Sequence, residues 1–502
     1  MLEPLSGLDA AFLSMETPTG RLHVAGVLVL DPPEGETRGP DLATRRFDEI
    51  RAVVGERVGR VPRLLRRAVH APWDLQRPVW VESPGIDLDV HVRRATVAAP
   101  GGPSELDALV GELLSRPLAL DRPLWEMVVA DGLAGGRTAV VARLHHAILD
   151  GVSGATAMAA FLDLAPDEPA EPAEPKRDGE DRADALTPEG PAGPSTVAMW
   201  KYAVSSFAHQ LGAAGELLQR SADAVVALSK QNRDLLSRGL QPPPAPFSAP
   251  RTPLNGAMTP ERCFASSSVP LADLELVRRD VGAHGKGEPV ELAVTMNDVI
   301  LAVVGGALRR YVSSRGELLP RPLVALVPVS TRGHPSVPST RRAHVGNYVS
   351  GMLVPLATTI EDPIARLHAI AAAGRVAKRQ ESVAGGELLE SLLRVVPPLV
   401  VSAVMRAVDR FSLFDRLPPP ANVVVSSVLV PDVSLWWAGS RVSAVYPAGP
   451  VADGVGLNIT SMTYRGTVHF GVVSCPSLVP DVHEVASHLH EAVAELVAAA
   501  SA

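Results

Sequence analysis

The paired histidines His145 and His146 are the residues of this chain whose type and spacing best suit catalysis. They follow an apolar run at residues 140–144 that is typical of a buried strand, and the turn-forming pair Asp150-Gly151 comes after three further residues. An imidazole at the end of a rigid strand can act as a general base, because it titrates near neutral pH. The segment therefore predicts a histidine base beside a loop that Asp150 fixes, with Ser153 capping the next helix.

The spacing leaves two other interpretations open. A histidine pair at a strand end is often a hydrogen-bonded structural feature without chemistry. A metal site is the second alternative, since His146 and Asp150 are four residues apart. Zinc takes three or four protein ligands, however, and no HExxH or CxxC pattern supplies the others. We therefore predict no bound metal.

The motif His-His-x-x-x-Asp-Gly resembles the signature of the acyltransferase superfamily that includes chloramphenicol acetyltransferase and peptide-synthetase condensation domains. Further blocks resemble one branch of it, the bacterial wax ester synthase/diacylglycerol acyltransferase family. The resemblance covers nearly the whole chain, and its blocks occur in the family's order at residues 5–13, 16–18, 23–24, 78–80, 123–126, 295–299, 346–347, 422–426 and 456–459.

The resemblance implies an α/β fold of two chloramphenicol-acetyltransferase-like lobes, with the active-site channel between them. The sequence pattern divides the chain accordingly. Residues 1–165 mix strand-like runs with amphipathic helical stretches and form the first lobe. Residues 166–245 form a linker, and residues 246–502, where the α/β pattern resumes, form the second lobe.

The predicted linker has two parts. Residues 166–194 are dominated by Pro, Glu, Asp, Ala and Gly, which bury too little apolar surface to order a chain, so this acidic part is expected to be flexible. Residues 196–240 contain no proline and carry apolar residues at helical spacing, which predicts one or two helices.

For the first lobe, the resemblance implies that His146 is the general base and that acyl transfer needs no covalent acyl-enzyme. His145 would orient or pack, Asp150 would pair with an arginine to hold the loop, and Gly151 would permit a backbone angle that a Cβ resists. Glu16 matches a family position where a carboxylate assists His146 or binds the acceptor, although a solvated surface glutamate fits the sequence equally well.

In the second lobe, Asn297 and Asp298 precede a helical pattern at residues 299–311 and by themselves predict a helix N-cap. The resemblance implies more for Asn297, which would face the channel and donate to the thioester oxygen or position a substrate. Asp298 would stabilise the start of the helix.

The triplet Pro123, Leu124 and Trp125 predicts a turn into a buried strand at residues 126–130. We interpret it mainly as architecture, in which Trp125 supplies a large apolar surface. Lining the substrate channel is the further role that the resemblance suggests for these residues.

Composition restricts the partners and the location. A formal net charge of −8 over 502 residues gives no basic footprint for nucleic acid. Two cysteines are too few for a disulfide framework, and no signal-peptide pattern is present, so we expect a cytoplasmic protein that is not secreted. The apolar run at residues 395–405 is too short to cross a bilayer. The pattern leaves the oligomeric state open.

Taken together, these patterns predict an acyl-CoA-dependent O-acyltransferase without a bound cofactor. It would move a long acyl chain to diacylglycerol, which makes triacylglycerol, and also to fatty alcohols, which makes wax esters. We expect peripheral contact with the inner face of the membrane or with lipid bodies, and residues 196–240 are the candidate surface.

Two alternatives stay open at this point. One is an acyltransferase for a specialised, polyketide-like alcohol, which the same histidine motif permits. The other is a catalytically weak protein that binds lipid droplets. The second is motivated by Ser427 and Cys475, because the family pattern has an asparagine and an aspartate at these positions.

Overall fold

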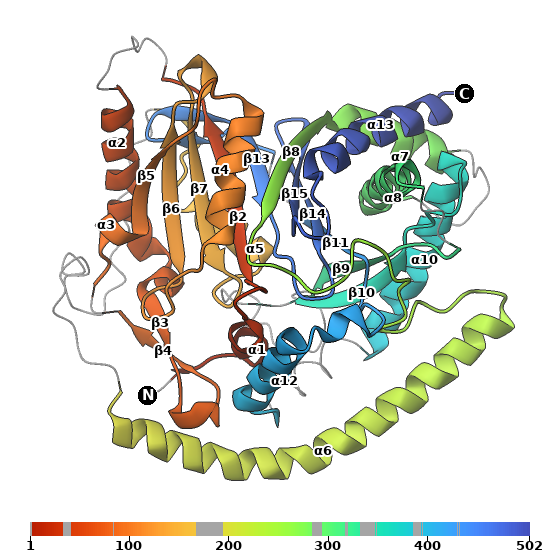
Figure 1. Cartoon of the computed structure of the whole chain (residues 1–502), viewed down its shortest axis with the longest axis horizontal. Coiled ribbons are helices and arrows are strands. Elements are labelled where there is room, and N and C mark those ends of the chain that lie inside the picture. Colours follow the sequence, from red (N-terminus) through yellow and green to blue (C-terminus); the bar gives the residue numbers. More distant parts are fainter. Residues whose placement is uncertain are drawn as a thin grey trace.

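The computed structural model describes residues 3–33, 42–83, 85–166, 194–283, 294–316, 320–331, 347, 349–384, 393, 395–428, 430 and 432–502. They form two lobes, each built on a six-stranded mixed sheet, as Figure 1 shows. The mixed α/β class and the two-lobed architecture predicted from the sequence are thereby confirmed.

The first lobe is built around the histidine strand. The predicted run at residues 140–144 lies inside β7, every residue of which is buried. The sheet order is β12-β13-β2-β7-β6-β5. Its strands are β2 (His23–Leu30), β5 (Val92–Thr96), β6 (Trp125–Asp131), β7 (Thr138–His145), β12 (Trp436–Trp437) and β13 (Ser440–Ala448).

Short elements surround this sheet. A three-stranded sheet of β1 (Glu3–Pro4), β4 (Val79–Glu82) and β3 (Arg66–Val69) lies near the N-terminus. The helices of this lobe are α1 (Gly7–Met15), α2 (Leu42–Arg57), α3 (Leu88–His91), α4 (Pro103–Ser115) and α5 (Gly151–Ala159).

The second lobe has the sheet order β10-β9-β11-β14-β15-β8. Helix α8 (Met296–Ser314) is buried along most of its length against this sheet and the neighbouring helices. The resumed α/β pattern predicted for residues 246–502 agrees with these strands and helices. The bounds are β8 (Cys263–Pro270), β9 (Val324–Ser330), β10 (Val349–Pro355), β11 (Val423–Val428), β14 (Leu457–Tyr464), β15 (Thr467–Ser474), α7 (Leu271–Ala283), α10 (Pro363–Ala384), α12 (Pro398–Arg410) and α13 (Val482–Ala500).

The lobes are interlocked through β12 and β13. These strands lie late in the sequence, yet β13 pairs with β2 in the first sheet, and Figure 1 shows this blue strand beside the orange ones. The division at residue 246 therefore differs from the structure, because residues 436–448 complete the first lobe. Local pattern identifies a strand but not the sheet that it joins. At Gly471 of β15 a Cβ would lie 1.7 Å from the Pro447 carbonyl oxygen of β13, so only glycine allows this close approach.

The linker helix is a single element. Helix α6 (Thr196–Ser237) runs for 42 residues and passes along the lower edge of the molecule in Figure 1. Its N-cap is Ser195, whose side chain accepts a bond from the Ala198 N–H. Tyr202 donates to the Arg77 carbonyl of the first lobe, and Asn232 accepts a bond of 3.5 Å from Gln380 of α10.

Most of the predicted flexible segment, residues 167–193, lies outside the described residues. No helix among the described residues has the length and apolarity needed to cross a bilayer.

Replacing Trp437 by alanine tests the interlocking. Trp437 is fully buried and packs in the core of the first lobe. We expect Trp437→Ala to lower the free energy of unfolding by about 3–5 kcal/mol in urea titrations followed by circular dichroism. The same change at Trp73, which is 73% exposed, should cost about 1 kcal/mol or less. Equal losses in the two variants would contradict the packing described here.

Candidate active site

The end of β7 places both histidines by backbone bonds. The His145 N–H donates to the Leu124 carbonyl at 2.9 Å, and the His146 N–H donates to the Leu22 carbonyl at 2.8 Å. Because successive side chains of an extended chain point to opposite faces, the two imidazoles have different surroundings.

The loop after the histidines is fixed by Asp150. Its carboxylate accepts a bond of 2.7 Å from the Ser153 N–H and is the N-cap of α5, which begins at Gly151. The expectation that Ser153 would cap this helix is therefore wrong. The helix starts earlier than predicted, and Ser153 supplies the backbone donor instead. The pairing of Asp150 with an arginine stays a prediction.

His145 uses both of its ring nitrogens. Its Nδ1 accepts a bond of 3.0 Å from the Ala147 N–H, and its Nε2 lies 2.9 Å from Oε2 of Glu16. A nitrogen that accepts a bond carries no proton, so the proton of the neutral ring is on Nε2 and is donated to Glu16. His145 is fully buried. It has no free lone pair with which to remove a proton from a substrate.

Glu16 is a buried anion between two histidines. Besides His145, it approaches Nε2 of His23 at 3.4 Å, and its side chain is 12% exposed, so it is not a solvated surface residue. Burial opposes ionisation of Glu16, but the contacts with His145 and then His23 outweigh it and lower its pKa to about 2. Burial lowers the pKa of His23 to about 4. Glu16 is therefore charged at neutral pH.

His146 is oriented by Asn347, which comes from the second lobe. The Asn347 side-chain NH₂ donates to the His146 carbonyl at 2.6 Å and to Oδ1 of Asp9 at 2.7 Å. A backbone carbonyl can only accept, so the amide orientation is fixed and its Oδ1 faces Nδ1 of His146 at 3.2 Å. An amide oxygen only accepts, so Nδ1 of His146 must be the donor in this contact. His146 therefore carries its proton on Nδ1 and a lone pair on Nε2.

The surroundings of His146 keep this lone pair available. The ring is partly exposed and packs on Phe12, with 4.3 Å between ring centroids. Burial lowers the pKa of His146 below the ordinary histidine value of 6.5. The imidazole is therefore neutral near pH 7 and is able to accept a proton through Nε2.

Sequence reasoning assigned no role to Asn347, Asp9 or His23. All three lie in the sequence blocks that carry the family resemblance. Their place in those blocks was the one feature of the sequence that could have indicated a role in the site. An isolated asparagine in a loop has no periodic pattern. Asp9 lies in the first turn of a helix, where the helix dipole already accounts for an aspartate. The sequence therefore offers no reason to expect its contact with Asn347, which is 338 residues away.

Asn297 lies beside the second sheet. Thr295, not Asn297 or Asp298, is the N-cap of α8, and Asp298 completes a capping box by accepting from the Thr295 N–H at 2.9 Å. The prediction that Asn297 is the N-cap is therefore wrong, because the N-cap lies two residues earlier, at Thr295. The Oδ1 of Asn297 accepts a bond of 3.5 Å from Ser427, the residue that stands where the family pattern has an amide.

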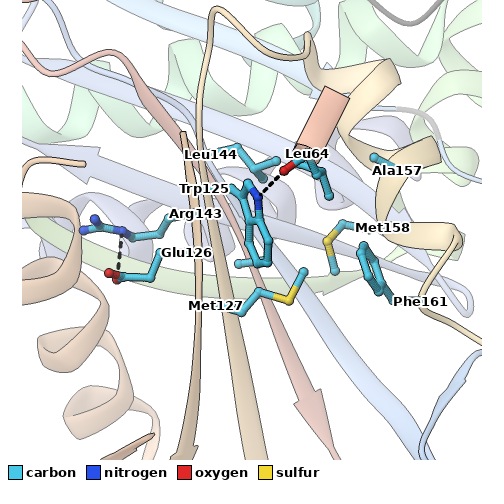
Figure 2. A pocket seen from close by; sticks show the side chains of 10 residues that line it. Leu64, Trp125, Glu126, Met127, Arg143, Leu144, Ala157, Met158 and Phe161 are labelled. Atoms are coloured by element: carbon cyan, nitrogen blue, oxygen red, sulfur yellow. Dashed lines mark hydrogen bonds and ion pairs between the residues drawn. The ribbon is translucent and has the colours of Figure 1, made fainter. Parts of the chain in front are cut away.

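The predicted channel residues lie beside the end of the histidine strand, where Trp125 of β6 pairs with Leu144 of β7. Leu124 and Trp125 are buried, and the indole of Trp125 donates to the Leu64 carbonyl at 2.8 Å. Figure 2 shows that Trp125 also lines a small pocket, in which two methionines face it across an apolar space. The apolar lining comes from Leu64, Trp125, Met127, Ala142, Leu144, Ala157, Met158 and Phe161. In the part of the chain that the structure describes, no group of three or more His, Cys, Asp or Glu side chains is arranged to hold a metal.

Two interlocked lobes with the paired histidines at their boundary form the fold of the chloramphenicol-acetyltransferase and condensation-domain type. The chain belongs to the wax ester synthase/diacylglycerol acyltransferase family, as its motifs predicted. Residues 5–285 match the catalytic domain of that family and residues 345–497 match its C-terminal domain. The protein is therefore an enzyme, an acyltransferase of the family that acylates diacylglycerol and makes wax esters.

Similar proteins agree with this assignment. A protein of Mycobacterium tuberculosis (strain CDC 1551 / Oshkosh), named as a candidate diacylglycerol O-acyltransferase, is 34% identical over 99% of this chain and 90% of its own length. The wax ester synthase/diacylglycerol acyltransferase of Marinobacter aquaeolei VT8 is 25% identical, with a TM-score of 0.67 over 100% of both chains. The first condensation domain of the calcium-dependent antibiotic synthetase shares the fold, with 16% identity and a TM-score of 0.54 over 100% of this chain and 97% of its own.

Replacing Asn347 tests its control of the base. Asn347→Ala removes the acceptor that holds the proton on Nδ1, so we expect kcat to fall about 100-fold while KM for the acyl donor changes less than about twofold. Asp9→Asn keeps an oxygen that accepts from Asn347 and should lose less than about tenfold. An Asn347→Ala enzyme with wild-type kcat would contradict the arrangement, provided that thermal melts show an intact fold.

Proposed function

We propose that His146 is the general base of acyl transfer from an acyl-CoA to an alcohol. The observation that carries the proposal is the bond between Nδ1 of His146 and Asn347, which leaves the Nε2 lone pair free. As Nε2 takes the proton of the acceptor hydroxyl, the oxygen attacks the thioester carbonyl. The new C–O bond forms, the C–S bond breaks, and the proton passes from His146 to the departing thiolate.

A thioester is already activated, so the protein supplies no nucleophile and no covalent acyl-enzyme forms. The bond between His145 and Glu16 supports a positioning role for both residues, since it holds the chain immediately before the base. Asp150 and Gly151 start α5 and thereby fix the loop on the other side of the base.

In the second lobe, we assign Asn297 to the developing oxyanion or to substrate positioning, with Asp298 as its structural support. The capping box of α8 supports the second role, because it fixes the backbone at Asn297. In the first lobe, Pro123, Leu124 and Trp125 line the acyl channel. For Trp125, the small apolar pocket in Figure 2 supports contact with an apolar group; Pro123 and Leu124 do not line that pocket.

The proposed reaction joins a long acyl chain to diacylglycerol and makes triacylglycerol, with long-chain alcohols as secondary acceptors. The name of the Mycobacterium tuberculosis relative supports diacylglycerol, and the name of the Marinobacter enzyme supports both acceptors. Because these acceptors partition into lipid, we place the enzyme in peripheral contact with the inner face of the membrane or with lipid bodies.

The direct test supplies purified enzyme with palmitoyl-CoA and either dioleoylglycerol or hexadecanol, and measures free CoA while resolving the products. His146→Ala should lower acceptor-dependent release by about 10²–10⁴-fold. His368→Ala, the same change at an exposed histidine of α10, should leave it unchanged. Absence of acceptor-dependent release with both dioleoylglycerol and hexadecanol would favour a specialised alcohol. Equal rates in His146→Ala and wild type, with droplet attachment intact, would favour a lipid-binding protein.

The pH profile gives a second test. Burial lowers the pKa of His146, and only the neutral ring accepts a proton. We therefore expect kcat/KM to be low in acid, to rise through the pKa of His146 at a midpoint below 6.5, and to be constant at neutral pH. A rise centred above pH 7 would show that a different group limits the reaction.

A further inference from the structure

Helix α12 has two unlike faces. One face packs on α1, where Ser402 donates to the Ser14 carbonyl at 3.1 Å. The opposite face exposes large apolar side chains, which is unusual for a helix that packs on a core. The exposed fractions are 40% for Leu399, 46% for Val400, 55% for Val404 and, just beyond the helix, 59% for Phe411. At helical spacing Val400, Val404 and Phe411 lie along one stripe.

Two further segments extend this stripe. The short helix η3 (Pro72–Asp74) contacts both α12 and α6 and carries Trp73, the most exposed large apolar residue among those described. Trp73 meets Trp200 of α6 edge to face, with 4.9 Å between ring centroids. On the same side of α6, Val197 and Val204 are 64% and 67% exposed. We call these exposed side chains together the apolar face, which consists of Trp73, Val197, Val204, Leu399, Val400, Val404 and Phe411.

Several cationic side chains flank the apolar face, although the whole chain carries a net charge of −8. The acidic neighbour of Trp73, Asp74, lies 2.8 Å from Nδ1 of His70. Arg406 and Arg410 are exposed beside the stripe on α12, and Lys201 is exposed between Val197 and Val204. Asp409, the acidic residue of α12, accepts a bond of 2.8 Å from the hydroxyl of Thr19. Apolar side chains with an aromatic residue and a cationic rim match an anionic lipid surface, where acyl chains lie beneath charged headgroups.

We propose that the apolar face docks the enzyme on an anionic lipid layer and that α12, rather than α6 alone, is its main contact. The inference rests on the proposed function, which makes the acceptor a lipid. Helix α1, on which α12 packs, carries Asp9 and Phe12 and leads into Glu16, so the docked surface lies one helix layer, about 10 Å, from the residues around His146. Figure 1 shows α12 between α1 and the course of α6.

The test is flotation of the full chain with vesicles of phosphatidylcholine alone or mixed with phosphatidylglycerol, both containing dioleoylglycerol. Val404→Asp should weaken binding to the mixed vesicles at least tenfold, and Trp73→Ser should weaken it severalfold. Arg406→Glu and Arg410→Glu should each cost about fivefold at low salt, and this loss should shrink at high salt. The matched control is Val433→Asp, at a valine that is 43% exposed away from the apolar face, and it should bind like wild type.

Wild-type binding by Val404→Asp and Trp73→Ser would overturn the proposal, as would failure of the wild type to float with either vesicle. His146→Ala should float normally, because docking does not use the base. Loss of docking in Val404→Asp with normal CoA release from hexadecanol dispersed in detergent supports the docking face. Absence of CoA release by the wild type would refute the proposed function, and the flotation result would still decide whether the apolar face binds lipid. Thermal melts of each variant exclude unfolding as the cause.

Discussion

The side-chain amide of Asn347 is the contact on which the rest of the site depends. It comes from the second lobe and bonds the ring and the carbonyl of His146 together with Asp9 of α1. One amide thereby fixes the ring proton of His146, the main chain of His146 and the helix packed beside it. The protonation that we propose for His146 depends on this contact between the lobes, and the strand β13, which completes the first sheet from the far end of the sequence, also joins them.

Neighbouring histidines acquire opposite functions from opposite hydrogen bonding. His145 accepts at Nδ1 and donates at Nε2 to the buried carboxylate of Glu16, which stays ionised because its two histidine neighbours outweigh the cost of burial. His146 donates at Nδ1 and keeps a lone pair on Nε2, which we propose accepts the proton of the acceptor hydroxyl. The same residue type is structural in one position and suited to proton transfer in the next, and the difference comes from partners that are distant in sequence.

Local pattern predicted what local physics determines. The apolar run before His145 is a strand because its residues bury both faces of a sheet. The segment 196–240 is helical from Thr196 to Ser237 because no proline interrupts it and its apolar residues recur at helical spacing. The cap positions were misplaced because Thr295, Asp150 and Ser153 are all good capping residues, and only the backbone decides which one is used. The partners of His146 and the sheet that β13 joins depend on pairings across hundreds of residues. Sequence pattern alone carries no signal for such pairings.

The opposite protonation of the two histidines can be observed directly by neutron diffraction from crystals of the deuterated enzyme at neutral pH. The account predicts deuterium on Nδ1 of His146 and on Nε2 of His145, with Nε2 of His146 bare. Deuterium on Nε2 of His146, with Nδ1 bare toward Asn347, would contradict it, because the nitrogen assigned to the acceptor hydroxyl would then have no lone pair to offer.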